Sequence, residues 1–307
     1  MRQEPLPDPP PPGTCVVEAL WSAISPGTER LVASGQVPTL LHDEMRCPHM
    51  DGDFSFPVKY GYSLVGEVRQ GPAELVGRRV HVLHPHQSHC VVPVSDVFEV
   101  SEEIPSARAT LASNVETAVT ALWDAHVMVG DRALVVGFGI IGSLVARLLS
   151  QICGVSVVVA EVSPERLALA RQMGFNAIEP QDLTTGFDVA FHASASSGGL
   201  QTCIDMVGFE GRVVELSWYG ARPAEVRLGT SFHSQRKSIV SSQVSHISPH
   251  QRGRWDYRRR KHLVFNLLKD EAFDAHITEV VAFDQLPGWF EGHLANPGPG
   301  LAFAVRY

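Results

Sequence analysis

The sequence predicts an α/β fold in which a doubly wound parallel sheet follows a smaller, mostly β domain. A G-x-G-x-x-G motif lies between an apolar strand and a helix within residues 132–161. Strands alternate with helices from there to about residue 244, which is typical of a parallel sheet covered on both faces. A length of 307 residues is sufficient for two domains, each with its own core.

Short strands dominate residues 14 to about 100 and predict a compact β barrel or sandwich. Residues 15–24 alternate apolar and polar side chains, as a half-buried strand does. The composition of Ser25–Arg30 indicates a turn. The first 13 residues are rich in proline and predict an extended lead-in. Further short strands, separated by glycine and proline, are expected within 58–68, 77–83 and 89–94.

The central motif begins after a helix expected over 106–129. Residues 133–136 form a buried strand, and a helix with apolar positions at three- and four-residue steps follows the glycines. A second strand, 155–160, ends in Glu161, 19 residues after Gly142. A membrane span over 133–160 is excluded because Arg147, Gln151 and Gly154 interrupt it.

The spacing of the motif predicts a dinucleotide site. Gly137 permits the tight turn, Gly139 lets the backbone approach a pyrophosphate, and Gly142 allows close helix–strand packing. The amides that open the helix, around Ile140 and Ile141, would hold the phosphates. Glu161 would accept hydrogen bonds from both ribose hydroxyls and repel a 2′-phosphate, so we expect NAD rather than NADP. Glycines that serve packing alone are the alternative.

The remaining strands are expected over 188–194, 211–217 and 237–244, with helices from Ser163 and over 199–207. Ligands of such sheets bind at the carboxyl ends of the strands. This predicts that the nicotinamide half faces His192, Ala193, Ser194 and the segment Ser217 to Gly220, which includes Trp218. A basic helix over 252–269 is either a clamp for an anionic substrate or a solvated face. The tail suggests a strand at 280–283, a short helix before Pro297, and a strand over 301–305.

Composition narrows the classes of function. The net charge of −8 argues against a general nucleic-acid or anionic-membrane binder. The N-terminus lacks the apolar core of a secretion signal, and the five cysteines are scattered, with no C-x-x-C pair. We therefore expect reduced thiols and a cytoplasmic location.

Four segments carry a resemblance to a known family: I-S-P-G-T-E, G-Y-S-L-V-G-E-V, V-G-F-G-I-I-G-S and G-R-V-V-E-L-S-W-Y-G. With the order of domains, they resemble the medium-chain dehydrogenase/reductase superfamily, which includes the zinc-type alcohol dehydrogenases. The first segment also resembles the branch that contains bacteriochlorophyllide a dehydrogenase. The resemblance implies a GroES-like catalytic domain over 14–115 and 275–307, a Rossmann domain over 116–274, and a homodimer.

The resemblance also implies where a catalytic zinc would be bound, and this chain departs from that pattern. Ser25 and Pro26 replace the first cysteine ligand, Tyr62 replaces the histidine of G-H-E, and the third ligand falls near Ser113. Hydroxyls alone do not hold zinc. The four-cysteine lobe for structural zinc is also missing, and we predict a zinc-independent member.

Residues 81–90 contain four histidines and a cysteine, His81, His84, His86, His89 and Cys90, with His42, Cys47 and His49 upstream. A metal site is one interpretation. The others are an alternating strand followed by a loop, and a histidine in the substrate cleft, His86 or His89, that donates a proton or a hydrogen bond.

The sequence thus predicts an NAD(H)-dependent oxidoreductase that acts on a small alcohol or carbonyl. Tyr62 and Thr28 occupy the family's positions beside the reacting oxygen, although Tyr62 is equally consistent with a core tyrosine. Glu116 is expected either to relay a proton or to cap a backbone group. Two other functions stay open, a nucleotide-binding protein without turnover and a zinc enzyme with ligands from the histidine cluster.

Overall fold

The computed structural model describes residues 2–296 and 298–307, so Met1 and Pro297 lie outside the described residues. The chain divides into two compact units. Unit 1 comprises Met1–Ser113, Lys261–Gly298 and Ala302–Tyr307, and unit 2 comprises Asn114–Arg260 and Pro299–Leu301. These limits fall a few residues before the expected 115/116 boundary and 14 residues before the expected 274/275 boundary.

Unit 1 is built on a seven-stranded sheet of order β14-β15-β1-β4-β5-β7, with β6 paired to β1. The long strand β1 is antiparallel to β4, β6 and β15, while β14 and β15 are parallel. The strands are β1 (Thr14–Ile24), β4 (Leu64–Gln70), β5 (Arg79–Val82), β6 (His89–Pro93), β7 (Phe98–Glu99), β14 (Ile277–Ala282) and β15 (Ala302–Arg306), and a separate pair is β2 (Asp51–Gly52) and β3 (Val58–Lys59).

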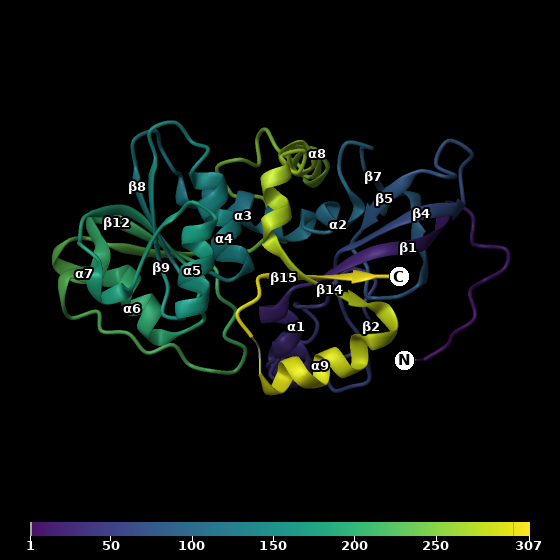
Figure 1. The fold of residues 1–307 in the computed structure, drawn as a ribbon, viewed down its shortest axis with the longest axis horizontal. Helices are drawn as coiled ribbons and strands as arrows, with labels where there is room; N and C mark the ends of the chain where they lie inside the picture. The colour runs from purple at the N-terminus through teal and green to yellow at the C-terminus, as the bar shows by residue number, and fades with distance from the viewer. Residues whose placement is uncertain (1, 297) are drawn as a thin grey trace. The chain divides into compact units, whose positions relative to one another are not determined.

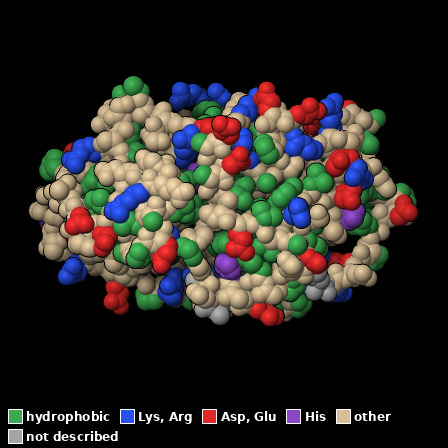
Figure 2. Space-filling model, in the orientation of Figure 1, with side chains coloured by type: hydrophobic (Ala, Val, Ile, Leu, Met, Phe, Trp, Pro, Cys, Tyr) green, Lys and Arg blue, Asp and Glu red, His purple; other side chains and the backbone are tan. Residues whose placement is uncertain are grey.

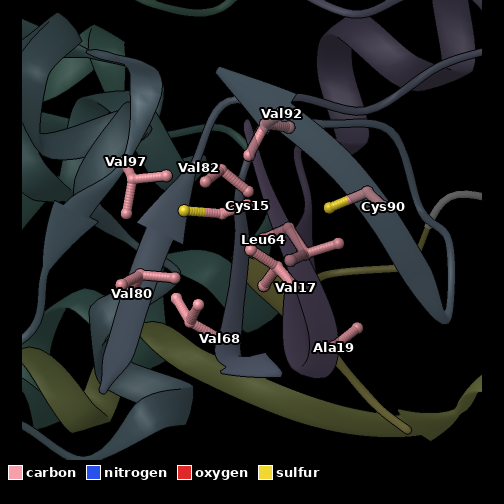
Figure 3. Close-up of a cluster of buried hydrophobic side chains, with 10 residues drawn as sticks. All are labelled: Cys15, Val17, Ala19, Leu64, Val68, Val80, Val82, Cys90, Val92 and Val97. Carbon is pink, nitrogen blue, oxygen red and sulfur yellow. The ribbon is translucent and has the colours of Figure 1, made fainter. Parts of the chain in front are cut away.

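Apolar side chains from β1, β4, β5 and β6 form the core of unit 1 (Figure 3). Val17, Leu64 and Val80 are fully buried there, as period-2 alternation requires of one face of a sheet. Cys15 and Cys90 belong to the same cluster, and burial raises the pKa of the Cys90 thiol to about 12. These two thiols therefore act as small apolar side chains.

The expected turn at Ser25–Arg30 is wrong, because residues 26–33 form the helix α1. Ser25 at the N-cap and proline in the first turn are a helix start that composition alone conceals. The helices of unit 1 are α1 (Pro26–Ala33), α2 (Ser106–Ala109) and α9 (Leu286–Ala295), with 3₁₀ turns at Thr39–Leu41, Val94–Asp96, Glu271–His276 and Phe283–Gln285.

Unit 2 contains a six-stranded parallel sheet of order β10-β9-β8-β11-β12-β13. Helices α4, α5 and α6 pack on it (Figure 1). The strands are β8 (Arg132–Val136), β9 (Ser156–Ala160), β10 (Asn176–Ile178), β11 (Phe187–His192), β12 (Val207–Glu215) and β13 (Ser238–Ser241). The helices are α3 (Ala112–Ala125), α4 (Ile140–Leu149), α5 (Pro164–Gln172), α6 (Ser197–Met206) and α7 (Ser231–Ser234), with a 3₁₀ turn at Pro180–Asp182. The predicted fold class, a GroES-like unit and a Rossmann unit, is confirmed.

The basic helix is shorter than expected and neither of its two interpretations describes it fully. Helix α8 covers Tyr257–Leu267, and residues 252–254 precede it in a turn. Arg260 and Lys261 are buried, while Arg258 and Arg259 are exposed. Basic and acidic side chains are interspersed over the face drawn in Figure 2. Among the described residues, no helix is both long and apolar enough to cross a bilayer.

Candidate functional site

The glycine turn after β8 has the shape that a dinucleotide requires. Gly137 has a φ of +96°, and a Cβ on Gly142 would lie 1.9 Å from the carbonyl oxygen of Gly137. A Cβ on Gly139 would meet no atom within 4 Å, and no side chain caps the helix that begins after it. The turn thus presents an open cradle in front of the first amides of α4, those of Ile140, Ile141 and Gly142, and a diphosphate fits this donor set.

Glu161 lies at the end of β9 and is 6% exposed. Its Oε2 accepts a 2.7 Å hydrogen bond from the Phe138 amide, inside the glycine turn. Its Oε1 accepts from the amides of Val162 and Ser163 at 2.8 and 2.9 Å. The carboxylate is therefore fixed beside the cradle, which adds to the role that the motif spacing predicts for it.

The carboxyl ends of β11 and β12 hold a polar network around His192, which is fully buried. Its Nε2 lies 2.7 Å from Ser194 Oγ, and its Nδ1 lies 2.8 Å from Glu215 Oε2. Ser217 contributes its Oγ, 3.3 Å from His192 Nδ1. Ala193 continues the strand, since its amide donates to the carbonyl of Val136, and Trp218 is half-buried in the loop after β12.

Glu215 is a member of this network that was not predicted, whereas Tyr219 lies within the expected segment 217–220. Tyr219 donates to Glu215 Oε2 at 3.2 Å. Burial acts to raise the pKa of Glu215, but hydrogen bonds from His192 and Ser217 outweigh it, and the net pKa is lowered. The parallel register of β11 and β12 places His192 opposite Glu215, and pairing the two expected strands in the sequence could have found it.

A second polar cluster lies in unit 1, around Tyr62. Its hydroxyl hydrogen-bonds to the side chains of Ser25 and Thr28, at the start of α1. Burial and the nearby Glu29 carboxylate raise the pKa of Tyr62 well above its usual value. Two predicted residues, Tyr62 and Thr28, are therefore together, and Tyr62 is a neutral phenol that can donate a hydrogen bond.

His86 belongs to the same cluster through Glu29. Its Nε2 lies 2.9 Å from Glu29 Oε2, and its Nδ1 lies 2.7 Å from Ser22 Oγ. Glu29 also accepts from the backbone amide of Ser25 at 2.8 Å, and Tyr307 lies 3.1 Å from Ser22 Oγ. A buried imidazole–carboxylate pair thus lies beside Thr28, which Glu29 directly follows in α1.

Zinc does not fit this cluster. The positions that the family uses hold the hydroxyls of Ser25, Tyr62 and Ser113, and Ser113 Oγ donates to the carbonyl of Tyr62. His86 and Glu29 have the right chemistry but are hydrogen-bonded to each other, and the nearby Cys47 thiol is hydrogen-bonded to Tyr60. Zinc needs about three such ligands. Throughout residues 2–296 and 298–307, no three histidine, cysteine or carboxylate side chains converge as a metal site would require.

The histidine side chains of residues 81–90 have separate partners. His81 Nε2 bonds to Ser63 Oγ at 2.9 Å, His84 stacks on His49, and His89 is exposed near Glu18. Burial lowers the pKa of His84 to about 4, and it also holds the pKa of His81 well below its usual value.

Glu116 lies in unit 2, where it pairs with Arg260 at 3.2 Å, and both side chains are buried. Arg260 also donates to Thr120 Oγ1 and to the carbonyl of Val244. This ion pair joins α3 to α8, and the proton relay or backbone cap expected of Glu116 stays a prediction.

Part of the chain is similar in sequence to known dehydrogenases. Residues 141–256 match the family model described as zinc-binding dehydrogenase. L-threonine 3-dehydrogenase of Cronobacter sakazakii is 28% identical over 153 residues, which are 46% of this chain and 43% of that protein. The chain thus spans less than half the length of the curated relatives it matches.

Solved structures cover the whole chain at lower identity. 2R,3R-butanediol dehydrogenase from Bacillus subtilis has a TM-score of 0.77 at 21% identity, covering 100% of this chain and 95% of its own. An alcohol dehydrogenase from Escherichia coli CFT073 complexed with NADH has a TM-score of 0.75 at 16% identity, with 100% and 94% covered. A zinc-binding dehydrogenase from Sinorhizobium meliloti bound to NADP has a TM-score of 0.77 at 16% identity, with 100% and 95% covered.

The structural matches establish the fold of both units, and the family model and curated relatives match part of the chain directly. Residues 141–256 are thus similar to the zinc-binding dehydrogenases, and both units have the fold that the medium-chain dehydrogenase structures share.

Proposed function

We propose that this protein is an NAD(H)-dependent oxidoreductase that interconverts a small alcohol and its carbonyl compound without zinc. The observation that carries the proposal is the glycine turn, where Gly139 leaves open space in front of an uncapped helix N-terminus. Bound nicotinamide would supply the hydride chemistry, and the chain would bind it and orient the substrate. The alcohol and polyol dehydrogenases among the structural matches support this class of reaction.

NAD is proposed over NADP because of Glu161. Its buried carboxylate is bonded to the Phe138 amide of the glycine turn, which supports a position next to the adenosine ribose. There a 2′-phosphate would bring two like charges together, whereas two ribose hydroxyls would donate to the carboxylate. The related structures include complexes with either nucleotide, so the preference rests on this one side chain.

On the substrate side, we propose that Tyr62 and Thr28 donate hydrogen bonds to the carbonyl or alkoxide oxygen. Tyr62 remains protonated because burial raises its pKa, and a neutral phenol is a donor. The His86–Glu29 pair, 2.9 Å apart, would exchange the proton that the alcohol loses or gains.

Titration with NADH and NADPH, followed by tryptophan fluorescence or calorimetry, tests the nucleotide site. We expect NADH to bind at least about tenfold more tightly than NADPH, because NADPH would lose one charge-assisted contact with Glu161. Metal analysis of the same protein should find less than one zinc per chain. Equal affinities, or stoichiometric zinc required for turnover, would contradict the respective part of the proposal.

The second candidate is a nucleotide-binding protein without turnover, favoured by the hydroxyls at the positions of the zinc ligands. A screen of alcohols, aldehydes, ketones and enones with NAD or NADH separates the two. Tight NADH binding without oxidation or reduction of any of them would favour this second function.

We also propose a homodimer in the cytoplasm. Strand β13 is an edge of the unit 2 sheet, and Ile239 on it is 36% exposed. An open edge pairs readily with its copy around a twofold axis. Light scattering coupled to size-exclusion chromatography would give twice the chain mass, and a monomer mass would refute the dimer.

A further inference from the structure

The turn between β11 and α6 presents an exposed serine hydroxyl above a buried histidine. Strand β11 ends at His192, helix α6 begins at Ser197, and Ser194 is exposed between them. The next residue, Ala195, has a φ of +50°, a left-handed conformation that non-glycine residues seldom adopt. Strained backbone in a strand–turn–helix is a device for raising a side chain out of the sheet edge.

Hydrogen bonds join Ser194, His192 and Glu215 in a chain in which each proton is donated toward the carboxylate. Glu215 accepts the Nδ1 proton of His192 at 2.8 Å, which leaves Nε2 as an acceptor. Ser194 Oγ is 2.7 Å from that Nε2 and donates its proton to it. Ser196 Oγ, 2.9 Å from Ser194 Oγ, accepts from the Gly199 amide and donates to Ser194.

The acid at the end of this chain is held as a carboxylate in one orientation. The amide of Ser217 donates to Glu215 Oε1 at 2.7 Å, and Tyr219 donates to Oε2 at 3.2 Å. A carboxylate fixed in this way selects the tautomer of His192 in which Nε2 lacks a proton. The imidazole can then take a proton from Ser194 and become a cation beside a ready counter-charge.

Stabilisation for a developing oxyanion is available from α6. A Cβ on Gly199 would lie 2.1 Å from Ser194 Oγ, so the hydroxyl rests on the first turn of this ten-residue helix. The amides of Ser197 and Gly198 open that turn, and a Cβ on Gly198 would meet no atom within 4 Å. Negative charge that forms there faces the positive end of the helix.

We propose that Ser194, His192 and Glu215 form a second catalytic site, one that transfers acyl groups from small activated carboxylic esters. Ser194 Oγ attacks the carbonyl carbon while His192 Nε2 takes its proton. The bond to the leaving alcohol then breaks, and His192 returns the proton to that oxygen. Water, with His192 as base, hydrolyses the acyl-serine to a carboxylic acid and free Ser194, without any change in oxidation state.

This site borders the nucleotide cradle. A Cβ on Gly137, the first glycine of the motif, would lie 2.9 Å from the backbone of Ser194. A nucleotide on the glycine turn would therefore cover Ser194, and the two activities should exclude each other. Acyl transfer itself needs no nucleotide, so it can be tested independently of the proposed oxidoreductase function.

The test uses two probes on the full-length protein, p-nitrophenyl acetate and an alkyl fluorophosphonate. We expect a stoichiometric burst of p-nitrophenolate, and peptide mapping should place the phosphonate on Ser194. Ser194→Ala should reduce both signals to background. Glu215→Gln, which keeps the shape of the acid, should slow labelling by about 100-fold or more, as loss of a triad carboxylate does.

The matched control is Ser150→Ala, which replaces another exposed serine, at the C-cap of α4. The labelling rate of this variant should equal that of the unaltered protein. Saturating NADH should protect Ser194 from the fluorophosphonate. If NADH binds and labelling continues at the same rate, the two sites do not overlap. The acyl-transfer proposal is overturned if folded protein gains no adduct on Ser194, or if Glu215→Gln reacts at the original rate. Thermal unfolding of each variant shows that the fold is retained.

Discussion

The carboxylate of Glu161 combines a structural and a recognition role at the scale of one residue. Three backbone amides already occupy three of the roughly four acceptor positions on its two oxygens. One of them belongs to Phe138, within the glycine turn. The acid therefore fixes the turn before any nucleotide arrives, and a ribose would complete its hydrogen bonds.

Replacement of Glu161 by glutamine should weaken NADH binding by about tenfold or more, since the charge and one acceptor oxygen are lost. The preference for NADH over NADPH should shrink at the same time, because the like-charge penalty disappears. Calorimetric titration with both nucleotides measures this. The control is Glu165→Gln, an exposed acid in the first turn of α5. Unchanged discrimination in Glu161→Gln would show that another group excludes the 2′-phosphate.

Buried histidines of unit 1 should make the protein sensitive to mild acid. Burial lowers the pKa of His84 from 6.5 to about 4. The unfolded chain takes up this proton near pH 6.5 and the folded chain only near pH 4, so stability is present above pH 6.5 and is lost as the pH falls toward 4. The loss for His84 is about 3 kcal/mol.

Urea unfolding of the protein and of His84→Gln between pH 7 and pH 4.5 measures this loss. The variant should have the flatter pH dependence, because glutamine stays neutral. The control is His89→Gln, whose side chain is 43% exposed, and it should keep the pH dependence of the unaltered protein. Parallel curves for His84→Gln and the unaltered protein would contradict the assignment.

At the scale of the element, alanine substitutions at two glycines of the same turn, Gly142 and Gly139, should affect stability differently. A Cβ on Gly142 would lie 1.9 Å from the carbonyl oxygen of Gly137, so Gly142→Ala must move α4 away from β8. We expect a loss of about 2 kcal/mol or more in the free energy of unfolding, as for other overpacked sites. Chemical denaturation with circular dichroism measures it.

Gly139→Ala is the partner variant, because its Cβ would meet only open space. Its stability should stay within about 1 kcal/mol of the original, the usual range for a change without a clash. NADH affinity should nevertheless fall at least about tenfold, because the methyl group fills the cradle. A stable Gly139→Ala protein that binds NADH normally would place the diphosphate elsewhere.

The ion pair between α3 and α8 should contribute to stability without contributing to nucleotide binding. Removing one partner of a buried pair leaves an uncompensated charge and costs about 3–5 kcal/mol. We expect such a loss for Glu116→Leu, and substantial recovery in the double variant Glu116→Leu/Arg260→Met. Urea unfolding of the three proteins tests this, with NADH affinity as the second measurement. A Glu116→Leu protein of full stability would contradict it.

Local patterns predicted the glycine turn and the parallel sheet because neighbouring residues determine them. The helix at 26–33 was missed, since Ser-Pro-Gly-Thr-Glu has the composition of a turn although Ser25 and Pro26 also begin helices. Glu215 was missed for a different reason. It lies 23 residues from His192, and only the register of two parallel strands brings the pair together. The Tyr62 cluster likewise joins α1 to segments distant in the chain.

On the scale of the whole molecule, each unit has its own sheet and its own core. Unit 2 is a nearly continuous stretch of chain, whereas unit 1 is assembled from segments on both sides of it. The final strand β15 pairs with β1 along Trp21–Ile24 and with β14 on its other side.

This placement of β15 has a consequence for synthesis on the ribosome. The segment that completes the first sheet emerges only after all of unit 2 has been translated, so unit 2 can fold while the nascent chain is still growing. Meanwhile the Trp21–Ile24 part of β1 lacks the partner that β15 provides, and its unpaired amides and carbonyls can associate with other nascent chains. A protein assembled in this order depends on chaperones at the ribosomal exit tunnel more than one whose strands emerge in the order in which they pair.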